Sequence, residues 1–522
     1  MSTDYPSPAS APLPGTLEQW AAVQPDRVAV VEGDRSLTWG QWNRAADRLA
    51  AGLRERGLGR DDIVVVRTHV RLEWVVIASA LAKLGCSLLG LNWRLTPTET
   101  RYVLGNSRAT AIICDDELPD DLLPAFDGLA LKLAVSIDTP GHGFIDYASL
   151  LVQDGGPFFS AGNPPLVIYT SGTTGLPKGV MSHQPAQLGD QITIEYTQDV
   201  RARRQGSRDD AILVTMPMHH ASGPAQVWAA QGSGCLLVLM RRFDAQGALV
   251  LIEKYRVSQW TGVPTMYKRI AALPIEEVRR YDLSSLTRLT VGAAPVTYAL
   301  KTWIIDNLGD CLQEGYGSTE TGMISRMTPE MQKLKPGSSG LPYRHVQIEI
   351  RDEHNAVLPV GETGEIWAFT PVVIRGYLNA PALTTDTLDE RGFFRTGDMG
   401  RMDEDGFLFI SDRAKDMIIS GGVNIYPAEV EAALQTHPAI VDAAVIGIPD
   451  DEFGESVLAF CEAKPGHAVD EAALLAHCAI TLASYKRPRA IRLVDELPRN
   501  GMGKLLKRDL RAPFWKDKER KV

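Results

Sequence analysis

Short apolar runs, rich in Val, Ile and Leu, alternate along most of the chain with segments long enough to be helices. The runs are DIVVVR (62–67), TAIICDD (110–116), PLVIYTSG (165–172), AILVTMP (211–217), CLLVLM (235–240) and LTRLTVG (286–292). Segments of helix length, such as 74–85 and 296–309, lie between several of them. Strands that alternate with helices favour largely parallel sheets covered by helices, and nearly continuous apolar strands indicate burial on both faces. The sequence therefore predicts an α/β fold.

The pattern changes twice toward the C-terminus. After about residue 343, short pieces with turn signals, such as VQIEIRDE and GEIWAFT, predict an antiparallel subdomain. From about residue 412, helix and strand patterns predict a compact α+β unit of about 110 residues, a reasonable size for a separate domain. We expect a disordered N-terminus at 1–15, a large N-terminal domain at 16–411 and a small C-terminal domain at 412–522.

Composition argues against several classes of protein. The 522 residues carry a formal net charge of −10, which disfavours nucleic acid as the main partner because phosphate backbones require a basic surface. No apolar stretch approaches the length of a membrane span. The six cysteines are scattered without a CxxC pair, so neither a zinc site nor a disulfide framework is indicated. The N-terminus also lacks the apolar core of a secretory signal, and we expect a cytoplasmic setting.

A polar, glycine-rich segment, YTSGTTGLPKGV at 169–180, directly follows one of the apolar runs. Glycines let a backbone approach a ligand closely, and successive N–H groups in such a turn form an anion-binding concavity. Ser171, Thr173 and Thr174 add donors, and Lys178 adds a positive charge. Neither GxxxxGK[ST] nor GxGxxG fits the segment, so it predicts a polyphosphate loop outside those two folds. The structural alternative is a flexible surface turn.

A second cluster, QEGYGSTETG at 313–322, combines an aromatic ring with hydroxyl and carboxylate groups. Tyr316 offers a flat ring on which a purine can stack. Thr319 can donate to a phosphate, and Glu320 is a hard oxygen ligand suited to Mg²⁺. The alternative for Tyr316 is an ordinary Tyr-Gly turn.

Two further clusters lie in the last third of the chain. In residues 394–431, Asp398 follows Thr-Gly and can accept from both ribose hydroxyls, and Arg413 follows a predicted strand. In PRNGMGKLLKRDL (498–510), Lys504 lies in a loop with flanking glycines. The alternatives are turn chemistry for Asp398, a surface ion pair for Arg413 and a solvated side chain for Lys504.

Together, in this order, the four clusters resemble the adenylate-forming superfamily, which includes acyl-CoA synthetases, aryl-CoA ligases, beetle luciferases and peptide-synthetase adenylation domains. The resemblance covers about residues 16–510. It implies a large N-terminal domain joined at a hinge to a small, mobile C-terminal domain. It also implies that ATP, with Mg²⁺, activates a carboxylic acid as an acyl-adenylate, and that a thiol then displaces AMP.

The resemblance implies a role for each matching position. The ATP-binding residues would be Thr170, Ser171, Gly172, Thr173, Thr174, Gly175, Lys178, Gly292, Ala293, Ala294, Glu314, Gly315, Tyr316, Gly317, Asp398 and Arg413. The catalytic residues would be Lys504, Glu320, Thr319 and His220, with Glu320 as the metal ligand. The acyl pocket would include His219, which stands where Phe is common, with His220, Gly292, Gly315 and Met323. The small domain would rotate about Lys415 between the two half-reactions.

Two segments near the C-terminus, DDEFGES and SYKRPRA, resemble the coenzyme A-binding parts of acyl- and aryl-CoA ligases. The implied coenzyme A contacts are Gly421, Gly422, Phe453, Tyr485, Arg487 and Arg489, and the alternative for the arginines is a solvated basic patch. Residues 217–231 contain no Asp or Glu, which argues against an amino acid substrate. A fatty acid and a bulky aromatic or alicyclic acid both fit a roomy apolar pocket.

Three functions stay open at this point. The first is an ATP-dependent acyl-CoA ligase whose partners are coenzyme A and a small-molecule carboxylic acid, either fatty or bulky aromatic or alicyclic. The second is an acyl-AMP ligase that loads a separate acyl carrier protein, and the third is a non-catalytic protein that binds adenylates or acyl groups. Lys504 and Glu320 argue against the third. The assembly is also open, with a homodimer among the candidates.

Overall fold

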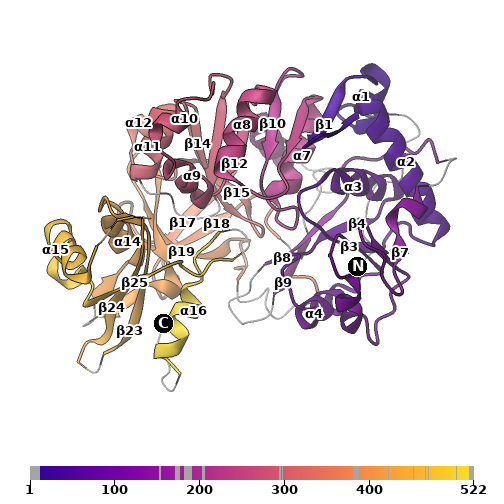
Figure 1. Ribbon diagram of the computed structural model, residues 1–522. Helices are drawn as coiled ribbons and strands as arrows, with labels where there is room; N and C mark the ends of the chain where they lie inside the picture. The colour runs from indigo at the N-terminus through magenta and orange to yellow at the C-terminus, as the bar shows by residue number, and fades with distance from the viewer. Residues whose placement is uncertain are drawn as a thin grey trace.

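The computed structural model describes most of the chain. The described residues are 12–151, 155–170, 177–181, 191–202, 206–292, 296, 298–374, 376–379, 387–420, 423–450, 452–464, 466–467, 469–500 and 503–516. Figure 1 shows two sheets with their helices in the part of the chain up to residue 342, and a smaller unit from orange to yellow that carries the C-terminal segments. Among the described residues, no helix combines the length and apolar character needed to traverse a bilayer.

The larger of the two N-terminal sheets has nine strands and is parallel through its centre. Its order is β16 (Leu341–Pro342), β15 (Gly322–Met327), β14 (Leu312–Ser318), β13 (Arg288–Gly292), β12 (Gln259–Gly262), β10 (Ala211–Val214), β11 (Leu236–Leu239), β1 (Val28–Glu32) and β2 (Arg35–Thr38). All neighbours from β1 to β14 pair in parallel, and the pairs β1–β2, β14–β15 and β15–β16 are antiparallel.

Helices cover both faces of this sheet, which explains its nearly continuous apolar strands. They are α6 (Gln191–Ala202), α7 (Ser222–Ser233), α8 (Ala245–Tyr255), α9 (Pro264–Ala271), α10 (Ile275–Val278), α11 (Tyr298–Leu308) and α12 (Pro329–Leu334). Along β10, Ile212 and Val214 join the core that includes α7, whereas Ala211 and Leu213 join the core that includes α8 and α9. Alternate residues of a strand point to opposite faces, so a strand covered on both sides is apolar throughout.

The second sheet has seven strands, parallel except at one edge. Its order is β7 (Ile145–Asp146), β6 (Leu133–Ser136), β5 (Ala111–Cys114), β3 (Ile63–Arg67), β4 (Ser87–Gly90), β8 (Leu166–Thr170) and β9 (Lys178–Met181). Only the pair β8–β9 is antiparallel among its described strands. The associated helices are α1 (Leu17–Val23), α2 (Trp39–Glu55), α3 (Leu72–Leu84), α4 (Pro97–Ser107), η1 (Pro119–Ala125) and η2 (Tyr147–Leu150).

Helix α3 is apolar on all sides because it lies in one core with strands of both sheets. The segment 74–85, which has helix length in the sequence, is thus a helix up to Leu84. Its one charged residue in that core, Lys83, is fully buried and pairs with Glu18 and Asp47, each 2.9 Å from Nζ. A buried ammonium requires such compensation because desolvation of an unpaired charge is very costly.

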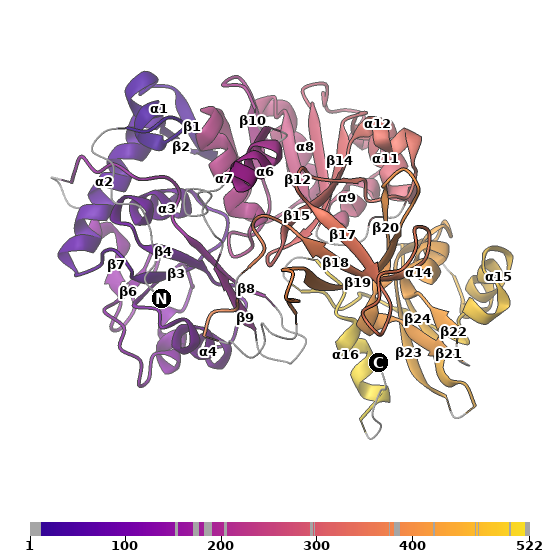
Figure 2. The same ribbon diagram turned by 180° about the vertical axis from the view of Figure 1, so that it is seen from behind.

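An antiparallel sheet follows the nine-stranded sheet in the chain, as the turn signals after residue 343 predict. Its strands are β17 (Gln347–Arg351), β18 (Gly364–Phe369), β19 (Phe394–Met402) and β20 (Leu408–Arg413). Figure 2 shows it between the nine-stranded sheet and the C-terminal unit. The expected Thr-Gly-Asp turn before Asp398 is part of β19, where Gly397 adopts φ +71° and the register with β20 shifts between Met399 and Gly400.

The C-terminal unit has its own sheet and core. Its strands are β21 (Ile418–Ser420), β22 (Val423–Ile425), β23 (Ile440–Asp450), β24 (Gly454–Ala463) and β25 (Ala490–Val494), with α14 (Pro427–Gln435), α15 (Glu471–Thr481), α16 (Lys507–Arg511) and the short turns η3 (Ala414–Asp416), η4 (Ser484–Lys486) and η5 (Ala512–Phe514). The predicted fold class is confirmed: a large α/β part with mostly parallel sheets and a smaller α+β unit.

The N-terminus at 1–15, which was expected to be disordered, is only partly described. Residues 1–11 lie outside the described residues. The backbone N–H of Gly15 donates to the side-chain oxygen of Gln19.

Candidate active site

The glycine-rich loop connects β8 to β9, whose end residues Thr170 and Lys178 pair across the hairpin. The predicted phosphate-binding residues Ser171, Gly172, Thr173, Thr174 and Gly175 lie outside the described residues, as do Ala293, Ala294, Gly421 and Gly422. The hydroxyl of Thr170 donates to Oε1 of Glu320 at 3.1 Å. The first strand of this hairpin therefore ends beside the carboxylate predicted to bind magnesium.

Tyr377, which lies outside the four sequence clusters, joins this corner. Its hydroxyl donates to Oε1 of Glu320 at 3.5 Å, and Nζ of Lys178 lies 4.9 Å from the centre of its ring. Burial and the Glu320 carboxylate raise the pKa of the Tyr377 phenol, so it stays a neutral donor. A Gly-Tyr dipeptide, the same pair as Gly315-Tyr316, is the sequence signal that could have found it.

A second group forms where β14 meets the antiparallel sheet. The hydroxyl of Tyr316 donates to Oδ2 of Asp398 at 2.7 Å, and Nε of Arg413 lies 2.8 Å from Oδ1 of the same carboxylate. Asp398 and Arg413 are also partners in the β19–β20 ladder. Burial, with Asp398, raises the pKa of Tyr316, and Asp398 raises that of Arg413. The predicted adenine and ribose contacts are thus brought together.

Lys504 reaches the same region from the C-terminal unit. Its backbone N–H donates to Oδ1 of Asn500 at 3.0 Å, which closes the loop that carries it. Burial and the nearby Arg413 guanidinium lower the pKa of Lys504 to about 8, although the charges of Asp398 and Glu320 act in the opposite direction. The Lys504 ammonium therefore lies within electrostatic range of Asp398, the predicted ribose contact, and Glu320, the predicted magnesium ligand.

The predicted hinge residue, Lys415, lies in η3 directly after β20. Burial lowers its pKa, and the charges of Arg413, Arg511 and Arg508 act in the same direction. The guanidinium of Arg511, at the end of α16, donates to the Lys415 carbonyl at 3.2 Å and also pairs with Asp416. The connection between the two parts of the chain is therefore fixed by contacts from the C-terminal segment.

Two adjacent histidines precede α7. Burial and the neighbouring His220 lower the pKa of His219 to about 3, and burial together with Lys504 lowers that of His220 to about 4. Nδ1 of His220 lies 3.2 Å from the hydroxyl of Ser222. Both imidazoles are neutral near pH 7, so they can offer hydrogen bonds at the predicted acyl site but no positive charge.

A cavity of about 270 Å³ opens beside these groups, between α7 and one face of the nine-stranded sheet. The predicted pocket residues Gly315 and Met323 line it. A Cβ on Gly315 would lie 2.5 Å from Cε of Met323, and a Cβ on Gly292 would lie 3.0 Å from the Gly315 carbonyl oxygen. Neither position therefore has room for a side chain unless its neighbour moves. Gln226, Gln259 and Arg288 share the wall with apolar side chains such as Ile212 and Trp260.

The remaining residues of the QEGYGSTETG cluster have varied surroundings. Glu314 also lines the cavity, and its carboxylate pairs with the buried Lys301 of α11. The backbone of Gly317 approaches Gly322 so closely that a Cβ would overlap its carbonyl oxygen. Thr319 lies in the turn between β14 and β15, where Ser318 and Thr321 exchange backbone-to-hydroxyl hydrogen bonds of 3.1 Å.

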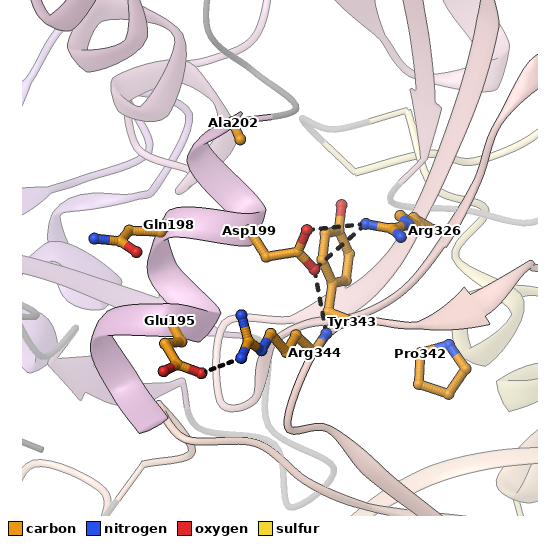
Figure 3. Close-up of a pocket in the computed structure, with 8 residues that line it drawn as sticks. All are labelled: Glu195, Gln198, Asp199, Ala202, Arg326, Pro342, Tyr343 and Arg344. Atoms are coloured by element: carbon orange, nitrogen blue, oxygen red, sulfur yellow. Dashed lines mark hydrogen bonds and ion pairs between the residues drawn. The ribbon is translucent and has the colours of Figure 1, made fainter. Parts of the chain in front are cut away.

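A larger hollow of about 580 Å³ lies between α6 and the β15–β16 edge of the nine-stranded sheet (Figure 3). Figure 3 shows that its wall is made of ion pairs: Asp199 faces Arg326, and Glu195 faces Arg344. It shares the lining residues Ala202, Arg326 and Tyr343 with the smaller cavity. None of the predicted site residues lines it, whereas Glu314, Gly315 and Met323 line the smaller cavity, which is therefore the candidate acid pocket.

The predicted coenzyme A contacts divide into two groups. The guanidinium of Arg489 lies 4.8 Å from the centre of the Phe453 ring, so these two residues form a joint aromatic and cationic surface. Arg487 instead donates to the carbonyls of Leu482 and Ala479 at 2.9 Å each, at the end of α15. Tyr485 is half exposed in the η4 turn.

No group of three or more His, Cys, Asp or Glu residues with the spacing of a metal site occurs in the described part of the chain. A magnesium ion that travels with a nucleoside triphosphate takes most of its ligands from phosphate and water and needs one or two carboxylates. Glu320, with the hydroxyl of Thr170 beside it, fits that requirement.

Comparisons with known proteins agree with this arrangement. The model of the AMP-binding enzyme family matches residues 17–378, and that of the AMP-binding enzyme C-terminal domain matches residues 429–504. The fatty acid–[acyl-carrier-protein] ligase ScoC of Streptomyces coeruleorubidus is 34% identical over 96% of this chain and 96% of its own. The indoleacetate–CoA ligase of Aromatoleum aromaticum is 33% identical over 95% of this chain and 96% of its own.

Among solved structures, the o-succinylbenzoate CoA synthetase of Bacillus subtilis, in complex with its acyl-adenylate intermediate, superimposes with a TM-score of 0.81 at 28% identity. The match covers 95% of this chain and 98% of that one. Sequence and structure thus agree over nearly the whole length of both proteins. The chain belongs to the AMP-binding enzyme family, the adenylate-forming superfamily that its sequence motifs resemble.

Proposed function

We propose that the protein is an ATP-dependent acid–thiol ligase, which converts a carboxylic acid to an acyl-adenylate and then transfers the acyl group to coenzyme A. The observation that carries this proposal is the convergence of Lys504 with Glu320, Asp398 and Arg413, which come from separate segments of the chain. A cationic side chain next to groups suited to magnesium and ribose is what the attack of a carboxylate on a nucleotide requires.

In the first step, a carboxylate oxygen attacks the α-phosphorus of ATP, the bond from that phosphorus to the bridging oxygen breaks, and pyrophosphate leaves. Catalysis of this step is mainly positioning and charge neutralisation. The Lys504 ammonium would bridge the carboxylate and α-phosphate oxygens. Glu320 and Thr170 would hold Mg²⁺, which when bound offsets the phosphate charge. The loop from Ser171 to Gly175, with Lys178, would hold the phosphates.

Asp398 is suited to the ribose. Tyr316 and Arg413 each engage one of its oxygens, and each carboxylate oxygen has a further lone pair for a ribose hydroxyl. The adenine would stack on Tyr316, against the backbone around Gly292 and Gly315. These roles are consistent with the pairing of β13 and β14, which places those two glycines opposite each other.

In the second step, the thiolate of coenzyme A attacks the acyl carbonyl carbon, the bond to the phosphate oxygen breaks, and AMP leaves. The small unit would present a different surface after rotating about Lys415, with the domain boundary between residues 411 and 412. Phe453 and Arg489 would bind the adenine and phosphates of coenzyme A. Such an exchange of surfaces by domain rotation is an established type of gating.

The cavity favours an acid of moderate size. At about 270 Å³ it lies near the lower end of the roughly 300–1,000 Å³ of small-molecule sites, so it suits an aromatic or short aliphatic acid better than a long extended chain. The amide and guanidinium groups of Gln226, Gln259 and Arg288 suit an acid with a second polar substituent better than a plain alkyl chain.

A second candidate acceptor is an acyl carrier protein. It is favoured by the similarity to the acyl-carrier-protein ligase of Streptomyces coeruleorubidus, which extends over nearly the whole of both chains. The first half-reaction would be the same, and only the thiol would differ.

The test is pyrophosphate release with ATP and Mg²⁺ over a panel of acids, from acetate through fatty acids to benzoates and larger ring acids, with and without coenzyme A. Turnover that continues only with coenzyme A, with the acyl thioester as product, is the expected result. A single burst of pyrophosphate that coenzyme A cannot sustain, followed by turnover only when a phosphopantetheinylated carrier protein is added, would establish the second acceptor. If none of the acids in the panel causes pyrophosphate release, the proposed function is contradicted.

The Lys504→Ala variant should lose adenylate formation and keep thioester formation from a supplied acyl-adenylate.

A further inference from the structure

A buried ion pair connects the two parts of the protein close to the Lys504 loop. Nζ of Lys268, on α9 of the large part, lies 2.6 Å from Oδ1 of Asp442, on β23 of the small unit. The Asp442 side chain is only 3% exposed and that of Lys268 is 18% exposed. Gln435 of α14 donates to the same carboxylate oxygen at 2.7 Å. The pair is thus removed from water and has defined partners on both sides.

The second oxygen of Asp442 continues the connection to Lys504. It pairs with the guanidinium of Arg499, which also lies 3.9 Å from Glu462. Nη1 of Arg499 then donates to the carbonyl of Gly503 at 3.1 Å, one residue before Lys504. A continuous set of charge-assisted bonds therefore runs from α9, through Asp442 and Arg499, to the backbone next to Lys504.

Helix α9 also touches the loop directly. Gly503 adopts φ +72° and packs so closely on Thr265 that a Cβ there would overlap the threonine hydroxyl. Thr265 and Lys268 are three positions apart, so they lie on one face of α9. The same helix face therefore contacts the Lys504 loop at Gly503 and anchors it through Lys268. Burial opposes the charge of Asp442, but Lys268 and Arg499 hold its pKa below the usual value.

We propose that Lys268, Asp442 and Arg499 form an ionic relay, a set of positioning residues that holds the Lys504 loop against α9 for acyl-adenylate formation and separates at Lys268 when the small unit turns. This role rests on the proposed function and adds to it Lys268 and Asp442, which lie outside the four sequence clusters, and Arg499, which lies in the fourth. Truncating one partner of a buried charge pair is costly, so the pair favours the orientation in which Lys504 faces the nucleotide site. The relay acts through Lys504 and touches no substrate.

The decisive variant is Lys268→Met, because it breaks only the contact that crosses between the two parts. Asp442 keeps Arg499 and Gln435, so its charge stays compensated within the small unit and folding is preserved. Lys268→Arg restores the charge, and Lys333→Met, which removes a pair with Asp310 at the surface, is the matched control. The two half-reactions are measured separately, as pyrophosphate release from acid and ATP and as thioester formation from a supplied acyl-adenylate.

The expected result is that Lys268→Met lowers the rate of pyrophosphate release at least tenfold, while thioester formation from the adenylate stays within about twofold or increases. Lys268→Arg should regain most of the loss, and Lys333→Met should resemble the wild type. Equal losses in both half-reactions, or no loss in the first, would overturn the relay.

Amide hydrogen exchange tests the same contact without any turnover. The N–H groups of Gly503 and Lys504 donate to Asn500, so they are protected while the loop is docked. Exchange in residues 498–506 should be at least fivefold faster in Lys268→Met than in Lys333→Met, and equal exchange would contradict the relay. This measurement also separates the two proposals, because a wild type that activates no acid would refute the ligase function and leave the exchange result to decide the relay.

Discussion

The hydroxyl of Tyr316 donates a hydrogen bond of 2.7 Å to Asp398, a residue 82 positions later in the chain. Tyr316 lies here because β14 brings its ring against the small core of Ile350, Ile366 and Leu408 in the antiparallel sheet. The bond therefore joins the group expected to hold the adenine to the group expected to hold the ribose.

Removing the charge of Asp398 should weaken nucleotide binding. In Asp398→Asn, Arg413 loses its carboxylate partner and the ribose loses an anionic acceptor. Hydrogen bonds to a charged group contribute about 1.5–3 kcal/mol, so we expect the KM for ATP to rise about tenfold or more. Tyr316→Phe, which keeps the ring and loses only the hydroxyl, should change it less. Steady-state pyrophosphate release as a function of ATP measures both, and an unchanged KM in a folded Asp398→Asn protein would exclude the ribose role.

The pKa of Lys504 predicts a pH dependence for the first half-reaction. The lysine acts as an ammonium, and burial with Arg413 lowers its pKa to about 8 in the free protein. The charged form is therefore complete below about pH 7 and is lost as the pH rises through 8. We expect kcat/KM for pyrophosphate release to fall by about tenfold per pH unit above that value.

Lys504→Arg is the control for this pH profile, because a guanidinium stays protonated throughout the range. Its activity should be lower at pH 7, since the geometry differs, but the decline between pH 8 and 9.5 should disappear. A decline that persists in Lys504→Arg would assign the titration to another group. The two histidines at the acyl site cannot produce it, because their pKa values of about 3 and about 4 lie far below this range.

Two glycines of β14 should respond differently to the same substitution. In Gly315→Ala, the new methyl group meets the flexible end of Met323, which can move, so the cavity narrows while the strand is kept. We expect the ratio of kcat/KM values to shift toward smaller acids by about tenfold, the size of effect that one methylene produces in an apolar pocket. A panel of acids that differ in bulk measures this ratio, and an unchanged ratio would place the acid elsewhere.

Gly317→Ala is the matched comparison, because its methyl group would overlap the carbonyl oxygen of Gly322 in the backbone of the neighbouring strand. Forced crowding of this kind costs about 1–3 kcal/mol. We therefore expect a lower free energy of unfolding in urea and no change of acid preference in the folded fraction.

The sequence predicted the architecture well because the alternation of apolar runs and helical segments follows from burial. Strands such as β3 and β10, covered on both faces, are apolar throughout and are easy to recognise. The strand β14 was harder, because its residues 313–318 serve the site and carry little apolar character. Local composition cannot identify a strand whose side chains are selected for ligand contacts.

The same reasoning explains which site residues were found. Tyr316, Asp398 and Lys504 lie in glycine-rich clusters, and glycine marks places where a backbone turns or approaches a ligand. Lys268 and Asp442 have no such mark: they are 174 positions apart, one in an amphipathic helix and one in a strand, and only the packing of the two units brings them together. Residues that position others across an interface therefore require the structure.

Arg487 and Arg489, which the sequence assigned to the same ligand, should respond differently to substitution by alanine. Arg487 donates to two carbonyls at the end of α15, where a cation also interacts favourably with the helix dipole. Arg487→Ala should therefore lower the stability of the protein by about 1–2 kcal/mol and leave the KM for coenzyme A unchanged. Arg489, which lies over Phe453, is available to a phosphate, and Arg489→Ala should raise that KM several-fold, less so at high salt because screening weakens the phosphate contact. Thioester formation at varied coenzyme A, with urea unfolding of each variant, measures both effects. An equal rise of KM in the two variants would return Arg487 to the coenzyme A site and make its contacts with α15 secondary.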